Sequence, residues 1–245
     1  MTSTLHKSSE AAEAARERGV HVAIILDGSG RWAELRGRSR SAGHRAGVEN
    51  VRRVVEAASG FGITTLTLYA FSVHNWQRPE PEVTELLGVL RDFLLEQAAE
   101  APARDVRVRV IGRRDRVPAT LRASIVAAEA ATAHARGLEL RLAIDYSARE
   151  SILRAAQRLA GVRGVTAETF AHGLDGERDA ASDVDFLIRT GGERRLSDFL
   201  LWEIAHAELW FTPILWPEFR VADLGCAMAE FRTRERSFGG LRRAV

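Results

Sequence analysis

The sequence predicts an α/β fold: a single domain with a central, mostly parallel six-stranded sheet flanked by helices. Short apolar runs alternate with longer segments of helical periodicity, which is typical of parallel strands connected through helices. No Pro-, Gly- or Ser-rich linker divides the chain, and no internal repeat is present. Strands are expected at 22–26, 64–69, 106–111, 138–144, 184–188 and 208–211.

These strands differ in how their apolar residues are interrupted. The runs at 22–26, 64–69 and 184–188 are nearly unbroken, as in strands buried on both faces. Residues 106–111 and 138–142 instead alternate apolar with polar side chains. We therefore expect these two strands to be half exposed or nearer an edge of the sheet.

Helical patterns separate the strands. Pro118 and Gly137 are start and stop signals for one helix, and the segments 161–164 and 173–176 are expected to be loops. Residues 1–20 are polar and predict a flexible leader before a folded domain at 21–245. Helices are expected near 44–59, 82–100, 118–136, 148–160, 197–206 and 223–236.

The segment 82–100 has apolar residues at helical spacing, so one face of this helix must pack on something apolar. The default partner is the sheet, but a helix lining a tunnel for a hydrocarbon would show the same pattern. These apolar residues are Val83, Leu86, Leu87, Leu90, Phe93 and Leu94.

Composition narrows the class of protein. The 245 residues are 46% hydrophobic and 28% charged, as in ordinary globular proteins, and the net charge of +2 gives no reason to expect a nucleic-acid partner. Cys226 is the single cysteine, which excludes an internal disulfide and any multi-cysteine metal site and suits a reducing cytosol. No apolar run approaches the length of a membrane span. A cytoplasmic location is expected, with peripheral contact at the inner face of the membrane left open.

The first predicted strand runs into Asp-Gly-Ser-Gly-Arg at 27–31. Ligands of open α/β sheets bind at the carboxyl edge, where glycines let backbone N–H groups approach an anion that Arg31 could clamp. Asp27 beside such an anion suggests a metal-bridged phosphate. The alternative is a turn in which Asp and Gly serve backbone conformation only.

Polar residues recur at other element ends. Gly43 and His44 open a predicted helix, where an anion would meet both the helix N-terminus and an imidazole, although such a histidine is more often a surface or capping residue. Ser72, Asn75 and Arg78 follow the second strand and supply hydrogen-bonding groups and a charge, unless they form a plain connection.

A third strand end carries the remaining candidates. Arg189, Arg195 and Ser197 are close enough in sequence to converge on one phosphate, and Glu208 could supply a second carboxylate. Two carboxylates surrounded by arginines suit Mg²⁺ bridging a diphosphate. Three strand ends with anion-binding chemistry are harder to explain as plain loops than one.

Together these segments resemble the cis-prenyltransferases, of which undecaprenyl diphosphate synthase is the best known. The resemblance covers residues 20–240 and rests on D-G-x-G-R-W-A, G-H-x-x-G, L-T-L-Y-A-F-S-x-x-N-W-x-R-P, I-R-T-G-G-E-x-R-L-S-x-F-L-L-W, E-L-x-F-T and W-P-x-F. It implies a homodimer with a hydrophobic tunnel in each subunit and makes 21–245 the catalytic domain. It further implies Mg²⁺-dependent addition of isopentenyl diphosphate to an allylic diphosphate primer such as farnesyl diphosphate, with new double bonds in cis.

The resemblance also implies residue roles. Asp27 is the catalytic carboxylate and binds Mg²⁺ with Glu208, and Asn75 takes part in proton removal. Positions that cradle the allylic diphosphate are Gly28, Gly30, Arg31, Arg40 and His44, and Ser29 and Trp32 are further substrate-binding positions. Ser72, Trp76 and Arg78 lie in the loop between the substrates, and Arg189, Arg195 and Ser197 bind isopentenyl diphosphate.

Several residues depart from the family pattern: Ser29, His74, Asp145, Arg194 and Ser237. They keep open a short-chain, coupling or cyclising variant, or a catalytically weak partner subunit. Retention of Asp27 argues against the weak subunit. Ala70 and Leu138 match regions of the family that affect product length.

Overall fold

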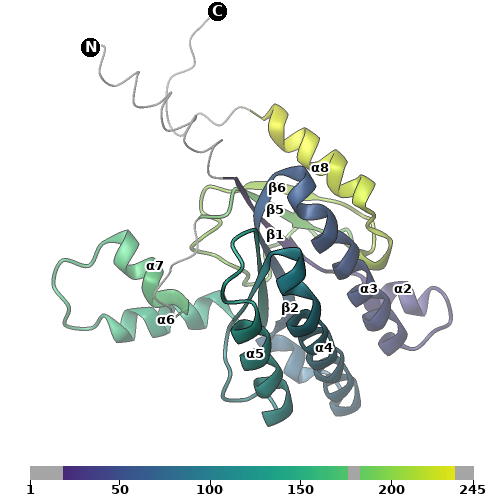
Figure 1. Cartoon of the computed structure of the whole chain (residues 1–245), viewed down its shortest axis with the longest axis horizontal. Coiled ribbons are helices and arrows are strands. Elements are labelled where there is room, and N and C mark those ends of the chain that lie inside the picture. Colours follow the sequence, from purple (N-terminus) through teal and green to yellow (C-terminus); the bar gives the residue numbers. More distant parts are fainter. Residues whose placement is uncertain (1–18, 176–182, 235–245) are drawn as a thin grey trace, which may run out of the picture.

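Six parallel strands form one sheet in the computed structural model, which describes residues 19–175 and 183–234 (Figure 1). The sheet order is β3-β4-β2-β1-β5-β6, so the six-stranded parallel sheet is confirmed. The strands are β1 Val20–Ile25, β2 Ile63–Ser72, β3 Val106–Ile111, β4 Leu138–Tyr146, β5 Phe186–Arg189 and β6 Glu208–Phe211.

Helices cover both faces of the sheet because side chains alternate along each strand. Val22 and Ile24 of β1 point into a large core with α3, α4, α5 and α8, whereas Ala23 and Ile25 point into a smaller core with the start of α6 and the segment 199–204. The helices are α2 Ser29–Glu34, α3 Arg40–Ala58, α4 Glu80–Glu100, α5 Ala119–Ala131, α6 Ala148–Arg158, α7 Ala167–Asp175 and α8 Val221–Thr233. The 3-10 helices are η1 Ser59–Phe61, η2 Val73–Gln77, η3 Ala101–Arg104 and η4 Trp216–Glu218.

β3 and β4 are the two strands nearest one edge of the sheet, as expected, but only β3 is half exposed. β3 is an edge strand whose residues alternate between buried and half-buried, as predicted. β4 lies between β3 and β2 and is buried nearly throughout, and even Arg141 is 2% exposed. The polar residues of β4 therefore do not make it a half-exposed strand: Arg141 is buried and lies 3.7 Å from the partly exposed carboxylate of Glu139.

Two predictions about helices are wrong. The segment 197–206 forms turns instead of a helix, because Ser197, Asp198 and Leu200 have positive φ angles of 50°, 62° and 47°. Gly173 lies inside α7 instead of a loop, and α7 packs against α6 in the part of the fold that projects to one side in Figure 1. The loop at 161–164 is confirmed.

Several predictions fall wholly or partly outside the described residues. These are positions 1–18 of the leader, residue 176 of the predicted loop 173–176, residues 235–236 of the predicted helix 223–236, residues 176–182 and 235–245 of the predicted domain, and Ser237. Among the residues that are described, no helix is long and apolar enough to cross a membrane.

Candidate active site

The three strands whose ends carry polar motifs are neighbours in the sheet. β1 lies between β2 and β5, and its last residue, Ile25, pairs with Tyr69 on one side and Arg189 on the other. All three strands are parallel, so the residues that follow them gather at one edge. This is the edge at which open α/β sheets bind ligands.

Asp27 lies between two arginines at this edge. Its Oδ1 accepts a hydrogen bond from Arg31 Nη2 at 3.1 Å, and its Oδ2 accepts one from Arg189 Nη2 at 2.9 Å. The side chain keeps 27% exposure, whereas the Arg189 side chain is only 4% exposed. The carboxylate is thus held from behind by a buried cation while it faces a region that a ligand can enter.

Backbone contacts fix the position of Asp27. Its carbonyl oxygen accepts hydrogen bonds from Trp216 N at 3.0 Å and Thr190 Oγ1 at 2.8 Å. Gly191, with a φ of 82°, approaches so closely that a Cβ there would lie 2.9 Å from the same carbonyl oxygen. The Arg-Thr-Gly-Gly turn after β5 therefore packs directly against the turn after β1.

The glycines after Asp27 shape the next turn. Gly28 has a φ of 112° and is the N-cap residue of α2, a conformation that suits glycine. Helix α3 crosses so near that a Cβ on Gly43 would lie 2.1 Å from the carbonyl oxygen of Ser29. The position of the Gly-Ser-Gly turn is set by this helix contact.

A second group of cations surrounds Glu82 of α4. Arg40 Nε donates to Glu82 Oε1 and Oε2 at 3.2 Å, Arg78 Nη1 donates to Oε1 at 3.1 Å, and His44 Nε2 lies 3.7 Å from Oε1. The sequence analysis did not single out Glu82, because an acidic residue in the first turn of a helix is ordinary. It holds three predicted phosphate-binding side chains together.

His44 lies one turn inside α3, since the helix begins at Arg40 with Ser39 as its N-cap. We expected His44 at the first turn of the helix, and this prediction is wrong, because the helix begins four residues earlier. Its Nδ1 is buried without a hydrogen-bond partner among the residues that the structure describes. Burial, and then the charge of Arg78, lower the pKa of this imidazole. His44 also lines the cavity, and the lowered pKa favours the neutral form of its ring there.

The loop after β2 is internally braced. Asn75 Oδ1 accepts from Ser72 N at 2.9 Å, and the Ser72 hydroxyl accepts from the backbone N–H of Asn75 in return. This capping box fixes the start of η2. Asn75 and Arg78 both reach the cavity, whereas the indole of Trp76 turns to the other side of the loop.

The turn after β5 brings together its own predicted residues. Arg189 Nη1 donates to Ser197 Oγ at 2.7 Å and to the carbonyl oxygen of Arg195 at 2.5 Å. Its Nε is buried with no hydrogen-bond partner in the described part of the chain. The guanidinium of Arg195 is two-thirds exposed and pairs with Glu193.

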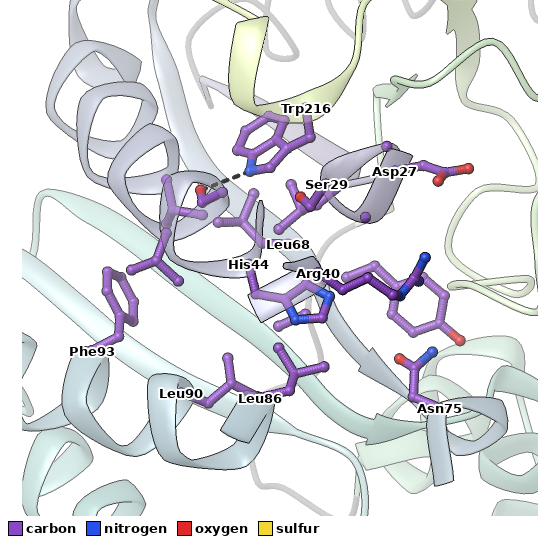
Figure 2. Close-up of a pocket in the computed structure, with 18 of the residues that line it drawn as sticks. Asp27, Ser29, Arg40, His44, Leu68, Asn75, Leu86, Leu90, Phe93 and Trp216 are labelled. Carbon is purple, nitrogen blue, oxygen red and sulfur yellow. Dashed lines mark hydrogen bonds between the residues drawn. The ribbon is translucent and has the colours of Figure 1, made fainter. Parts of the chain in front are cut away.

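A cavity of about 210 Å³ connects the polar edge to the interior. Figure 2 shows Arg40, His44 and Asn75 toward one end and Phe93 at the other, with Leu86 and Leu90 of α4 along one wall. The apolar face of α4 therefore packs into the large core of the sheet and also lines a cavity, and a hydrocarbon in that cavity stays a prediction. The other apolar lining residues are Leu26, Val48, Val51, Leu68, Ala70, Leu142 and Trp216.

Other candidates lie away from this cavity. The guanidinium of Arg36 lies over the ring of Trp32, 4.7 Å from its centroid. Leu138 is buried at the start of β4. Glu208 pairs with Phe186 in the β5–β6 register, three residues before Arg189, and accepts from Arg234 Nη1 at 2.9 Å. It lies at the opposite end of the strands from Asp27, and the chain does not bring the two carboxylates together.

Two further residues position the site although sequence reasoning missed them. Trp216 contacts Asp27 through its backbone and donates from Nε1 to Gly47 O on α3 at 2.8 Å (Figure 2). In the sequence, only the W-P-x-F motif pointed to this residue. Tyr69 donates to the carbonyl oxygens of Tyr146 and Ser197 at 3.2 and 3.3 Å. Burial raises the pKa of this phenol, which stays a hydrogen-bond donor to the turn that contains Ser197.

The acidic and histidine side chains do not form a ready metal cage. No group of three or more His, Cys, Asp or Glu side chains able to hold an ion occurs in residues 19–175 and 183–234. Any ion at Asp27 would need oxygens from a ligand to complete its coordination.

Comparisons with known proteins identify what the chain is similar to. A family model described as "Putative undecaprenyl diphosphate synthase" matches residues 25–239. Isoprenyl transferase 1 of Bradyrhizobium diazoefficiens is 54% identical over 226 residues, which cover 92% of each chain. Isoprenyl transferase of Brucella abortus is 47% identical over 229 residues, covering 90% of this chain and 89% of the relative.

Solved structures agree with the sequence relatives. Lavandulyl diphosphate synthase from Lavandula x intermedia, in complex with dimethylallyl diphosphate, superposes with a TM-score of 0.86 at 36% identity, covering 90% of this chain and 98% of that one. A probable undecaprenyl diphosphate synthase from Campylobacter jejuni gives a TM-score of 0.76 at 33% identity with the same coverage.

Proposed function

This chain belongs to the cis-prenyltransferase family, and from that premise we propose that it condenses isopentenyl diphosphate with an allylic diphosphate primer, such as farnesyl diphosphate, to a cis-polyprenyl diphosphate. One observation carries the proposal. The cavity has cationic and hydrogen-bonding groups at its mouth and only hydrocarbon side chains toward Phe93. A ligand that matches this cavity has an anionic head and an apolar tail.

The primer is placed by matching its two parts to the cavity. Its diphosphate lies at the Gly28 turn with Arg31, Arg40 and His44, and its hydrocarbon lies between α4 and the sheet. Isopentenyl diphosphate lies at the turn held by Arg189, Arg195 and Ser197. Asn75, between the two, takes part in removing the proton, with its amide already oriented by Ser72.

The reaction breaks the C–O bond to the primer's diphosphate, which leaves with the electron pair. The double bond of isopentenyl diphosphate attacks the allylic carbon, and loss of one proton forms the new cis double bond. Arg31 and Arg40 stand where charge develops on the leaving group, so they stabilise the transition state more than the ground state.

Mg²⁺ fits the donor set at Asp27. Each carboxylate oxygen has a lone pair beyond the one used by its arginine, and Mg²⁺ is usually held by one or two carboxylates plus substrate phosphates. When bound, the ion neutralises charge on the leaving diphosphate. We propose Glu208 as a second metal-associated carboxylate, and since it lies at the far end of the strands, it would approach Asp27 only from a second copy of the chain.

A homodimer is therefore part of the proposal. β6 forms one edge of the sheet in the described part of the chain, and Leu209 on it is 39% exposed. Light scattering after gel filtration should give twice the 27.0 kDa chain mass, whereas a monomer that makes product would contradict this assignment. The diphosphate substrates and the single Cys226 favour the cytoplasm, with contact at the inner membrane face for the lipid product.

The experiment supplies purified protein with Mg²⁺, farnesyl diphosphate and labelled isopentenyl diphosphate, and the dephosphorylated products are sized. We expect labelled polyprenols that disappear with chelator. If no labelled lipid forms with dimethylallyl, geranyl or farnesyl primers, the chain is the catalytically weak partner subunit that the sequence left open.

A coupling or cyclising variant is the second candidate, favoured by the likeness to lavandulyl diphosphate synthase and by Ser29 in the diphosphate turn. The same assay separates it from the first candidate. Product from dimethylallyl diphosphate alone, without isopentenyl diphosphate, supports coupling and contradicts chain elongation.

A further inference from the structure

Asp145, at the end of β4, is a completely buried carboxylate with three donors. Arg116 Nε donates to its Oδ2 at 2.9 Å, Arg116 Nη2 donates to its Oδ1 at 2.5 Å, and Trp76 Nε1 donates to Oδ1 at 2.8 Å. A buried charge persists only where it is paired and hydrogen-bonded, which these donors achieve.

The backbone around Asp145 is also constrained. Its φ of 51° is in the left-handed region, and its carbonyl oxygen accepts from Arg113 N at 3.2 Å. A Cβ on Gly112 would lie 2.1 Å from the carbonyl oxygen of Ile144. The carboxylate is thus presented from a rigid junction between β4 and the turn after β3.

Trp76 connects this junction to the active site. It lies in η2 between Asn75 and Arg78, which both line the active cavity. Its indole turns to the other side of the loop, where it packs edge-on against Phe71 with centroids 5.2 Å apart, and the Arg116 guanidinium lies 5.9 Å from its ring. Through Trp76, the loop after β2 is therefore attached to β2 and β4 on the side away from the cavity.

We propose that Asp145 and Arg116 are positioning residues that hold Asn75 and Arg78 at the active site by fixing the indole of Trp76. The effect on catalysis rests on the proposed function, whereas the fixing of the Trp76 indole does not. The negative charge of Asp145 pairs with the Arg116 guanidinium and keeps it beside the Trp76 indole. An asparagine at this position would lack that charge. The competing explanation is that the pair merely stabilises the turn at 112–118.

Trp76 itself gives a ligand-free readout. Subtracting the fluorescence spectrum of Trp76→Phe from that of the parent isolates the Trp76 contribution from the other four tryptophans. Asp145→Asn and Arg116→Gln should each move that contribution to longer wavelength, because the half-buried ring loses its fixed position and becomes more exposed to water. Arg114→Gln is the matched control, since Arg114 lies on the same turn but pairs with Glu129 at 2.6 Å.

Kinetics test whether the effect passes through Trp76. Asp145→Asn and Arg116→Gln should lower kcat/KM for isopentenyl diphosphate about 10- to 100-fold, the usual range for loss of a supporting partner. In a Trp76→Phe background the same two substitutions should lower kcat/KM further by less than about 3-fold, because the effects of residues that act through one side chain are not additive. Arg114→Gln should leave kcat/KM unchanged even if it lowers the melting temperature.

Three results would overturn the inference: an unmoved Trp76 spectrum in both variants, losses that multiply in the Trp76→Phe background, or activity that falls only with the folded fraction. If Asp145→Asn does not fold, Arg116→Gln and Trp76→Phe still decide the question. If no prenyl transfer occurs in any form, the proposed function fails, while the spectra still report whether the pair holds the loop.

Discussion

Arg189 and Asp27 form an ion pair of 2.9 Å across the ends of two adjacent strands, β5 and β1. The arginine is buried and also holds Ser197, whereas the carboxylate reaches the mouth of the cavity. One side chain therefore couples the two turns to which we assign the two diphosphates. The pair orients both turns before any substrate arrives.

Asp27→Asn should abolish turnover while leaving the fold intact. The amide can still accept a hydrogen bond from Arg189, but it cannot supply the charge that a metal ion needs. We expect kcat to fall by roughly 10²- to 10³-fold or more, as when one transition-state contact is removed. The free energy of unfolding should fall by about 1 kcal/mol, because the amide still accepts a hydrogen bond from Arg189, which also keeps its other partners. Product assays and urea unfolding measure the two effects, and unchanged turnover would refute the role of Asp27.

Gly43→Ala and Gly88→Ala should change stability in opposite directions. Both glycines lie in helices, but a Cβ on Gly43 meets the Ser29 carbonyl oxygen at 2.1 Å, whereas one on Gly88 meets nothing within 4 Å. The first substitution should lower the free energy of unfolding by about 2 kcal/mol through overpacking and should also displace the diphosphate turn. The second should raise it by about 0.5 kcal/mol through helix propensity. Urea unfolding of both variants gives the comparison, and equal stabilities would contradict the close contact of α3.

His44 should make the protein less stable in mild acid. Burial, and then the charge of Arg78, lower the pKa of His44 in the folded state below its ordinary value of about 6.5, so the unfolded chain binds the proton more readily. The stabilisation is therefore complete above about pH 6.5 and is lost as the pH falls toward the lowered pKa. His44→Gln should flatten the decline of the unfolding free energy below pH 6.5, as measured by urea titrations from pH 5 to 8. An unchanged slope would show that the ring is protonated in the folded protein.

The spacing of apolar residues predicted the secondary structure correctly wherever local sequence and long-range packing favour the same element. All six strands, and the shared edge to which Asp27, Ser72 and Arg189 belong, could be predicted, because unbroken or alternating apolar runs mark strands and parallel strands end at one edge. The contacts between side chains from different elements could not be predicted in this way. Glu82 and Asp145 are single acidic residues whose importance depends on which arginines the fold brings to them.

The missing helix at 197–206 shows how tertiary contacts override a local pattern. Asp198 caps α6, with its Oδ1 accepting from Arg149 N at 2.9 Å and its Oδ2 accepting from the Ser147 hydroxyl at 2.5 Å. Arg189 meanwhile holds Ser197 Oγ. These partners keep residues 197 and 198 in the left-handed region, which a helix cannot contain. The apolar residues that follow pack against β1 and β5 from turns.

Ala70→Leu should shorten the products, because Ala70 of β2 lines the cavity that we assign to the growing chain. Three added carbons take up part of about 210 Å³, so kcat/KM for farnesyl diphosphate should fall about 10-fold or more relative to dimethylallyl diphosphate. Leu138→Val is the control, since Leu138 lies in the core at the start of β4, outside the cavity lining in the described residues. It should lower the unfolding free energy by about 1 kcal/mol without changing product sizes. Product sizing with both primers measures the effect. An unchanged distribution in Ala70→Leu would mean that the hydrocarbon lies elsewhere, and shorter products from Leu138→Val alone would shift the length-determining wall to β4.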